Sequence, residues 1–284
     1  MTASRKLANT GLDRDYDLRT AFPDYAAYFE DWRARSLRAR QELSCLLDVR
    51  YGPGLRDRVD FFVAASRPAP LLVYIHGGYW RSMDKSDFSF LAMPFVKRGV
   101  SLAVINYDLF PGTTMSRLVA QVESAYAWVA HNAARVGVPC SSIHLAGWSA
   151  GAHLAAMLLC GNGRTPGLPI ASLFAISGIY DLRPIVETSA NADLGLDLLE
   201  AERNSPIRLS PAVSTCPVGL AWGAGETAAF RSQSSSLADV WRRQGVKIAM
   251  LEVPQVHHYA IMHRLGDDSS EVFAEAARLL RLQA

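Results

Sequence analysis

The feature that most limits the fold of this chain is a regular alternation of short apolar runs with longer helical segments. The apolar runs lie at 71–75, 102–106, 143–146, 172–176, 218–222 and 247–253, after two further strand candidates at 46–49 and 60–64. The segments of helical periodicity lie at 116–136, 151–159, 230–244 and 269–282. Runs that are apolar on both faces are typical of parallel strands that helices cover on both sides. The sequence therefore predicts an α/β fold with a mostly parallel central sheet and helices on both faces.

Two segments lie outside this alternation. Residues 1–47 are expected to form an N-terminal helical extension, because residues 24–47 mix aromatic side chains with Arg and Glu at helical spacing. This extension either packs on the body of the protein or caps a site. Residues 184–211 are expected to run over the carboxyl edge of the sheet, where ligands bind in open α/β sheets. Because no internal repeat or low-complexity linker is present, we expect one domain over 1–284.

Charge and hydropathy limit the partners of this chain. The formal net charge is +2, from 29 Lys and Arg against 27 Asp and Glu, with no run of like charge. A nucleic-acid arm would show such a run, so we expect a small-molecule partner and no nucleic acid. The first twenty residues carry charges throughout and lack the apolar stretch of a secretion signal. We therefore expect a cytoplasmic protein without a membrane partner, and a homodimer stays open.

The strongest chemical signal is the pentapeptide GWSAG at 147–151, with Ser149 at its centre. It directly follows the strand candidate at 143–146 and opens the helical segment at 151–159. In that context the G-x-S-x-G pattern is a nucleophile elbow, in which the serine hydroxyl projects above the sheet. The pattern alone occurs by chance in unrelated proteins, so the strand and helix on either side make it specific. We expect Ser149 to be a catalytic nucleophile.

A second motif, HGGYW at 76–80, follows the strand candidate at 71–75 immediately. Loops of this HGG type supply backbone N–H groups that stabilise the negative oxygen of a tetrahedral intermediate. We expect Gly77, Gly78 and Ala150 to form this oxyanion hole. The alternative is a glycine-rich turn followed by two aromatic core residues.

A nucleophilic serine needs a general base, and in proteins with this elbow an acid and then a histidine follow the serine along the chain. Two histidines, His257 and His258, come shortly after the last strand candidate. The base is expected to be one of them, and their position alone leaves both open. His263 is expected to be a solvated side chain. No carboxylate lies at a useful spacing for a metal site with these histidines, so no metal or cofactor is expected.

The acid that orients the base should follow the preceding strand. The strand candidate at 218–222 leads through Gly-Ala-Gly into Glu226, which is the expected acid. A carboxylate there holds the imidazole in the productive tautomer and stabilises the imidazolium. Glutamate is one methylene longer than the commoner aspartate, so an ordinary surface role stays open for Glu226. Asp181, which follows the strand candidate at 172–176, is the reserve candidate.

Together these residues resemble the kynurenine formamidases (arylformamidases), in the hormone-sensitive-lipase-like branch of the α/β hydrolases. The resemblance covers most of the chain after about residue 70, and its motifs are HGGYW at 76–80, NYDL at 106–109, GWSAGAHLA at 147–155, SGIYDL at 177–182 and HY at 258–259. In this family the histidine precedes an aromatic residue, which favours His258, and the acid sits where Glu226 falls. The resemblance implies an α/β-hydrolase fold and two-step acyl transfer that needs no cofactor.

The resemblance leaves the substrate open. Aspartate is frequent in the family where Glu226 stands, and homologues with this signature also act as carboxylesterases or on other amides. We expect an arylformamidase-like amidase of the N-formylkynurenine type, with a carboxylesterase on small esters as the alternative. A third reading is a non-catalytic binding protein, although such proteins usually lose a triad member. For a flat aromatic leaving group, Tyr79, Trp80 and Trp148 are the expected binding surfaces, with core packing as the alternative for each.

Overall fold

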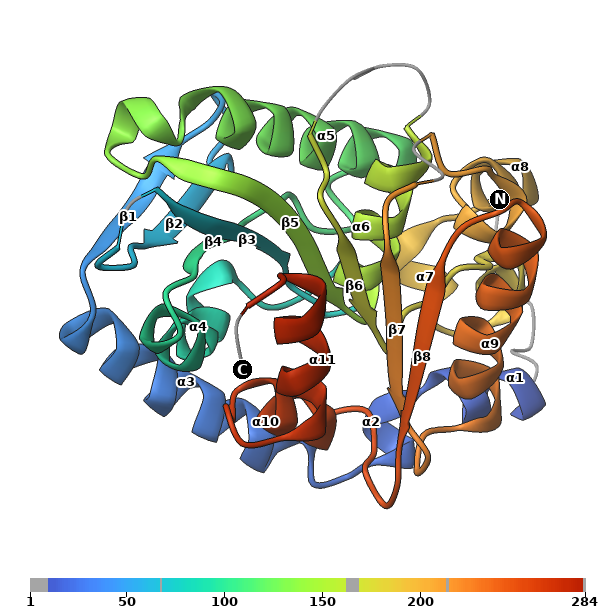
Figure 1. Cartoon of the computed structure of the whole chain (residues 1–284). Helices are drawn as coiled ribbons and strands as arrows, with labels where there is room; N and C mark the ends of the chain where they lie inside the picture. The colour runs from blue at the N-terminus through green and yellow to red at the C-terminus, as the bar shows by residue number, and fades with distance from the viewer. Residues whose placement is uncertain (1–9, 67, 162–168, 213–214, 283–284) are drawn as a thin grey trace.

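The computed structural model describes residues 10–66, 68–161, 169–212 and 215–282. At its centre is an eight-stranded sheet with the strand order β1-β2-β4-β3-β5-β6-β7-β8 (Figure 1). The strands are β1 (Cys45–Arg50), β2 (Arg58–Phe62), β3 (Ala69–Ile75), β4 (Ser101–Ile105), β5 (Cys140–Trp148), β6 (Leu173–Ile176), β7 (Val218–Gly223) and β8 (Ile248–Val253). Strands β3 to β8 pair in parallel, whereas β1 pairs antiparallel with β2 and β2 antiparallel with β4. The predicted mostly parallel sheet is confirmed.

Helices cover both faces of this sheet, as the sequence predicts. Figure 1 shows α4 and α11 in front of the sheet and α5 and α6 behind it. The α-helices are α1 (Thr10–Tyr16), α2 (Leu18–Ala21), α3 (Tyr25–Glu42), α4 (Ala92–Lys97), α5 (Met115–Asn132), α6 (Ala150–Cys160), α7 (Asn191–Leu194), α8 (Leu198–Arg203), α9 (Ala228–Arg243), α10 (Ala260–Leu265) and α11 (Glu271–Leu279). The 3-10 helices are η1 (Lys85–Leu91), η2 (Ala134–Val136), η3 (Arg183–Glu187) and η4 (Pro206–Arg208). No helix in the described ranges has both the length and the apolar content needed to cross a membrane.

The pairing of β3 with β5 brings two predicted motifs together. Every residue of β4 and nearly every residue of β3 is buried, as expected for strands covered on both faces. In the parallel register between β3 and β5, Ile75 is paired with Gly147. The chain leaves β3 one residue later, so the HGGYW loop starts beside the GWSAG motif. Both motifs therefore lie at the carboxyl edge of the sheet.

The N-terminal extension packs on the body through α3. The sequence predicts one helix over 24–47, but α3 ends at Glu42 because the next residue, Leu43, adopts an extended conformation. The following residues pair with β2 as strand β1, and this pairing outweighs the helical pattern. Trp32 of α3 is fully buried, with its ring 5.4 Å from that of Trp148. The extension thus contributes to the hydrophobic core beside the elbow.

A buried ion-pair network joins the extension to the sheet. Lys85 Nζ lies 2.9 Å from Asp60 Oδ1 and 2.7 Å from Asp48 Oδ1. Arg40 of α3 also contacts the Asp60 carboxylate, which is fully buried in β2. Removing one partner of such a network leaves a buried charge without a counter-charge.

We predict that Asp60→Asn lowers the free energy of unfolding by about 3 kcal/mol or more, because the buried Lys85 and the half-buried Arg40 lose their shared carboxylate. Urea unfolding followed by circular dichroism measures the change. The control is Asp268→Asn, because Asp268 pairs at 2.7 Å with Lys97, whose side chain is 70% exposed. Exposed pairs contribute little, so the control should change stability hardly at all. Equal stability of the two variants would show that the network does not hold the extension.

Candidate active site

Ser149 occupies the sharp turn between β5 and α6. Its φ of 57° and ψ of −122° lie in a region that non-glycine residues rarely adopt. Its N–H donates a hydrogen bond to the Ile176 carbonyl at 2.8 Å, which fixes the turn against β6. The residue is 2% exposed and lines a pocket at the carboxyl edge of the sheet. The strand-turn-helix context predicted around Ser149 is present.

The two glycines of the elbow are required by close backbone contacts. A Cβ added to Gly147 would lie 2.3 Å from the Gly151 carbonyl oxygen. A Cβ added to Gly151 would lie 2.0 Å from the carbonyl oxygen of Ile75. Side chains at these positions would push β3, β5 and α6 apart, so the tight turn needs residues without a Cβ.

His258 and Glu226 form a buried pair at the same edge of the sheet. His258 Nδ1 lies 3.1 Å from Glu226 Oε2, and each side chain is at most 1% exposed. The other carboxylate oxygen, Oε1, accepts hydrogen bonds from Ser177 Oγ at 2.5 Å and from the Gly223 N–H at 2.7 Å. Sequence analysis did not single out Ser177, although it lies in the SGIYDL motif. These contacts hold the carboxylate against the imidazole.

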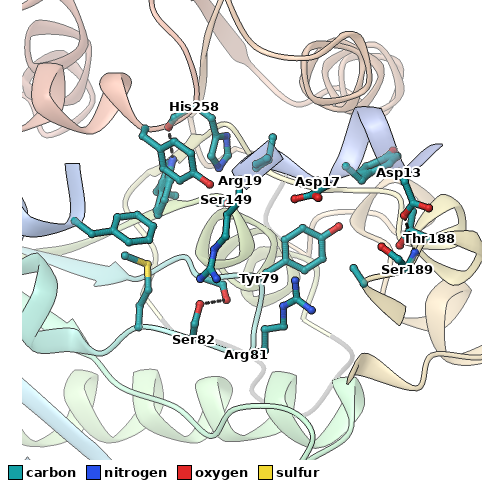
Figure 2. Close-up of a pocket in the computed structure, with 18 residues that line it drawn as sticks. Asp13, Asp17, Arg19, Tyr79, Arg81, Ser82, Ser149, Thr188, Ser189 and His258 are labelled. Atoms are coloured by element: carbon teal, nitrogen blue, oxygen red, sulfur yellow. Dashed lines mark hydrogen bonds between the residues drawn. The ribbon is translucent and has the colours of Figure 1, made fainter. Parts of the chain in front are cut away.

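Ser149 and His258 line the same pocket (Figure 2). No hydrogen bond joins their side chains in the part of the chain that the structure describes. Such contacts are often long without substrate and tighten only when substrate is bound. The arrangement therefore brings together a serine at an elbow, a carboxylate and an imidazole, in the chain order that accompanies a G-x-S-x-G elbow.

Asp181, the reserve candidate for the acid, lies in a different ion pair. Its Oδ2 is 2.6 Å from Arg183 Nη2. Burial raises the pKa of Asp181, but its hydrogen bonds and ion pair with Arg183 lower that pKa by more. Asp181 is therefore an ionised partner of Arg183, and the geometry favours Glu226 as the partner of the histidine.

The other two histidines near the site contact the N-terminal extension. His257 Nε2 lies 3.3 Å from Asp24 Oδ2. His263 Nε2 lies 3.0 Å from Asp31 Oδ2, and its side chain is 38% exposed. Between the two possible bases, only His258 is paired with Glu226. Within the described ranges, no group of three or more His, Cys, Asp and Glu side chains is arranged to hold a metal ion.

Buried polar contacts fix the HGGYW loop from behind. His76 Nδ1 lies 2.7 Å from the Gly77 carbonyl oxygen, and His76 Nε2 lies 3.1 Å from Asn106 Oδ1. The Tyr107 hydroxyl donates to the His76 carbonyl at 2.6 Å. Burial lowers the pKa of His76 to about 4, so its ring is uncharged at neutral pH. Gly78 follows with a φ of 112° and lines the pocket.

The three aromatic residues expected to contact substrate are placed differently from one another. Tyr79 and Trp148 line the pocket, and Trp148 Nε1 donates to the His258 carbonyl at 3.0 Å. Trp80 is fully buried, is absent from the pocket wall and donates from Nε1 to His153 Nδ1 at 3.2 Å. The structure therefore corrects the expectation for Trp80, whose ring packs against α6 behind the loop instead of facing a substrate.

The pocket wall also contains residues that no sequence motif marks. They come from the two segments expected near the site, the N-terminal extension and residues 184–211 (Figure 2). They include Asp13, Asp17, Arg19, Thr188 and Ser189. These residues reach the elbow only through the folding of the chain, because they lie far from Ser149 in sequence.

The fold and the site together define an α/β hydrolase. A family model described as BD-FAE matches residues 60–174. The kynurenine formamidase of Salmo salar is 35% identical over 239 residues, which cover 81% of this chain and 80% of that protein. The chain belongs to the kynurenine formamidase family, and it is a hydrolase.

Two solved structures agree with this assignment at the level of the fold. A crystal structure of a candidate thioesterase from Silicibacter sp. tm1040 has a TM-score of 0.84 and 29% identity, and covers 94% of this chain and 98% of that one. Esterase B from Lactobacillus rhamnosis has a TM-score of 0.73 and 16% identity, and covers 93% of this chain and 95% of that one. The predicted α/β-hydrolase fold is confirmed.

We predict that Glu226→Ala lowers kcat by about 1,000-fold or more, because the imidazole loses the carboxylate that orients it. The matched control is Asp181→Ala, which removes a nearby carboxylate that pairs with Arg183 and should leave kcat within about threefold of the wild type. Both rates are measured on a substrate that the wild-type enzyme turns over, after circular dichroism has shown that each variant is folded. A larger loss for Asp181→Ala would transfer the role of the acid to that residue.

Proposed function

We propose that this hydrolase cleaves the formamide of an N-formyl arylamine of the N-formylkynurenine type. The observation that carries the proposal is the buried His258–Glu226 pair, which shares a pocket with Ser149 in a member of the kynurenine formamidase family. Ester hydrolysis would use the same three residues, so the choice between amide and ester depends on the substrate and not on the chemistry of the site.

In the first step, Ser149 Oγ attacks the formyl carbon while His258 Nε2 takes the hydroxyl proton. The contact between His258 Nδ1 and Glu226 leaves Nε2 free to act as the base and stabilises the imidazolium that forms. The carbonyl double bond opens, and its oxygen becomes the negative oxygen of a tetrahedral intermediate.

Backbone N–H groups of Gly77, Gly78 and Ala150 are the proposed donors to that oxygen. Two observations support this assignment. Gly78 lines the pocket together with Ser149, and Ala150 is the first residue of α6, whose N-terminus carries a partial positive charge. Donors that are fixed before the reaction stabilise developing charge at little reorganisation cost.

In the second half of the reaction the intermediate collapses and the bond between carbon and nitrogen breaks. His258 gives its proton to the departing arylamine nitrogen, which leaves a formyl ester on Ser149. A water molecule then attacks this ester with His258 again as the base, and formate is released. Every proton is returned, so the cycle consumes one water molecule and needs no cofactor.

We also propose that the start of the N-terminal extension caps the pocket. The wall of the pocket includes Asp13 of α1, Leu18 of α2 and Phe29 of α3. A cap of this kind limits the access of water and completes the surface that contacts the leaving group.

We predict that kcat/KM on N-formyl-L-kynurenine exceeds kcat/KM on p-nitrophenyl acetate by about 100-fold or more. The physical reason is that the pocket wall contacts the large leaving group, whose binding contributes to transition-state stabilisation. Ser149→Ala serves as the blank, and its kcat should fall by about a million-fold while its circular dichroism spectrum stays unchanged. If only the ester is turned over, the protein is a carboxylesterase. Retained activity in Ser149→Ala would remove the serine from its role.

A further inference from the structure

The proposed oxyanion donors come from two elements that are far apart in sequence. Gly77 and Gly78 belong to the HGGYW loop after β3, whereas Ala150 is the first residue of α6. Donors on separate elements stabilise one oxygen only when their mutual positions are fixed before the reaction. A contact that joins the HGGYW loop to α6 therefore affects catalysis, although the contact itself can lie outside the pocket.

His153 makes such a contact from the first turn of α6. Its N–H donates to the Ser149 carbonyl at 3.2 Å, one helical turn after the nucleophile. Its ring nitrogen Nδ1 accepts the Trp80 indole N–H at 3.2 Å, and the two rings are almost perpendicular, at 87°. Among the described residues this is the one side-chain hydrogen bond between the HGGYW loop and α6. His153 is fully buried and lies outside the pocket wall.

The partners of His153 leave one arrangement of its ring proton. The Trp80 indole N–H can only donate, so Nδ1 is the acceptor. The Asn204 carbonyl can only accept, so Nε2, at 2.7 Å, carries the proton. Burial lowers the pKa of His153 to about 4, so the ring is uncharged at neutral pH and keeps this tautomer. Asn204 is itself held in place, because its Nδ2 donates to the Glu200 carbonyl at 2.8 Å.

The loop that Trp80 anchors has a backbone that needs support from its surroundings. Tyr79 and Trp80 both have a φ of 56°, in the left-handed region that residues with side chains seldom adopt. Such a backbone persists only where surrounding contacts hold it. The Gly78 carbonyl accepts the Arg81 N–H at 3.1 Å and the Ser82 N–H at 3.0 Å. Because this turn closes around Trp80, a shift of the indole is transmitted to Gly78.

We propose that His153 is a positioning residue, which fixes the oxyanion loop relative to the nucleophile through the hydrogen bond from Trp80. Without this acceptor the buried indole N–H has no partner, and a buried donor without a partner destabilises the conformation that buries it. The loop then moves away from its productive position. The inference rests on the proposed function, because it concerns the donors that this function assigns to the HGGYW loop and to α6. His153 itself takes no part in bond breaking.

Two substitutions at position 153 separate the hydrogen bond to the loop from the hydrogen bond to Asn204. His153→Asn places its amide oxygen near the position of Nδ1 and keeps an acceptor for Trp80. His153→Gln reaches the position of Nε2, so it keeps a donor for Asn204 and removes the acceptor for Trp80. Each variant loses one buried hydrogen bond and part of the ring volume. A merely structural role for His153 would therefore make the two variants behave alike.

We expect His153→Gln to lower kcat by about tenfold or more with KM within about twofold of the wild type, because oxyanion contacts strengthen only in the transition state. His153→Asn should lower kcat by less than about threefold. The rates are measured on N-formyl-L-kynurenine and on p-nitrophenyl acetate, after circular dichroism has shown that each variant is folded. The inhibition constant of phenyl trifluoromethyl ketone, to which Ser149 Oγ adds to form a tetrahedral adduct, should rise in His153→Gln by about the factor that kcat loses.

Trp80→Phe gives a second test, because it removes the indole N–H that His153 accepts. In this background the further substitution His153→Gln should lower kcat by less than about threefold, since the hydrogen bond is already absent. An undiminished loss in the double variant would show that His153 does not act through Trp80, and the inference would be overturned.

Three other results would overturn the inference and leave the proposed function intact. They are full activity of His153→Gln, equal losses of kcat in His153→Gln and His153→Asn, and an affinity for the trifluoromethyl ketone that His153→Gln does not change. A wild-type enzyme that hydrolyses the ester and not the formamide would instead contradict the proposed function. The same comparison of variants on the ester and on the ketone would then decide the inference separately.

Discussion

The parallel register between β3 and β5 is the constraint on which the rest of the site depends. Because Ile75 pairs with Gly147, β3 and β5 end beside each other at the carboxyl edge of the sheet. The backbone of α6 then approaches the end of β3 so closely that Gly151 has no room for a side chain. Ser149 is held between these elements in its rare conformation. The loops that carry Glu226 and His258 meet at the same edge, where the Gly225 N–H donates to the Val256 carbonyl at 2.9 Å.

Local sequence predicts the parts of the site that depend on chain order. The elbow at Ser149 follows from glycine spacing between a strand and a helix, and Glu226 and His258 follow the next strands in the expected sequence. The direction in which a side chain points is harder to predict from sequence. Tyr79 and Trp80 are adjacent aromatics in one loop, yet Tyr79 lines the pocket and Trp80 is buried. The loop bends through positive φ at both residues, and no pattern of hydrophobicity encodes such a bend.

The N-terminal wall was the least predictable part of the site. Asp13, Asp17 and Arg19 lie in a stretch with no motif, and they reach the elbow only through long-range contacts of α1 and α2. The same difficulty affects the end of α3, where the helical pattern continues to residue 47 but pairing with β2 takes the chain into β1. In both places tertiary contacts outweigh local preference, so sequence periodicity cannot locate the boundary or the pocket residues.

The histidines show how environment separates chemical roles within one residue type. Burial lowers the pKa of His153 to about 4, and the ring joins the Trp80 indole to the carbonyl of Asn204, 2.7 Å from its Nε2. His76 is likewise buried and uncharged behind the HGGYW loop. Both rings are uncharged and are held by hydrogen bonds in the protein interior. His258 instead faces the pocket and has a carboxylate as its partner. Residue type alone does not distinguish these two uses.

The order of elements along the chain separates the groups proposed for catalysis from one wall of the pocket. The groups proposed for bond cleavage directly follow strands of the sheet, whereas Asp13, Asp17 and Arg19 of the pocket wall lie within a short stretch before the first strand. A change in that stretch therefore alters the pocket wall while the sheet, the elbow and the His258–Glu226 pair stay as they are. One wall of the pocket can therefore change independently of the strands that carry the rest of the site.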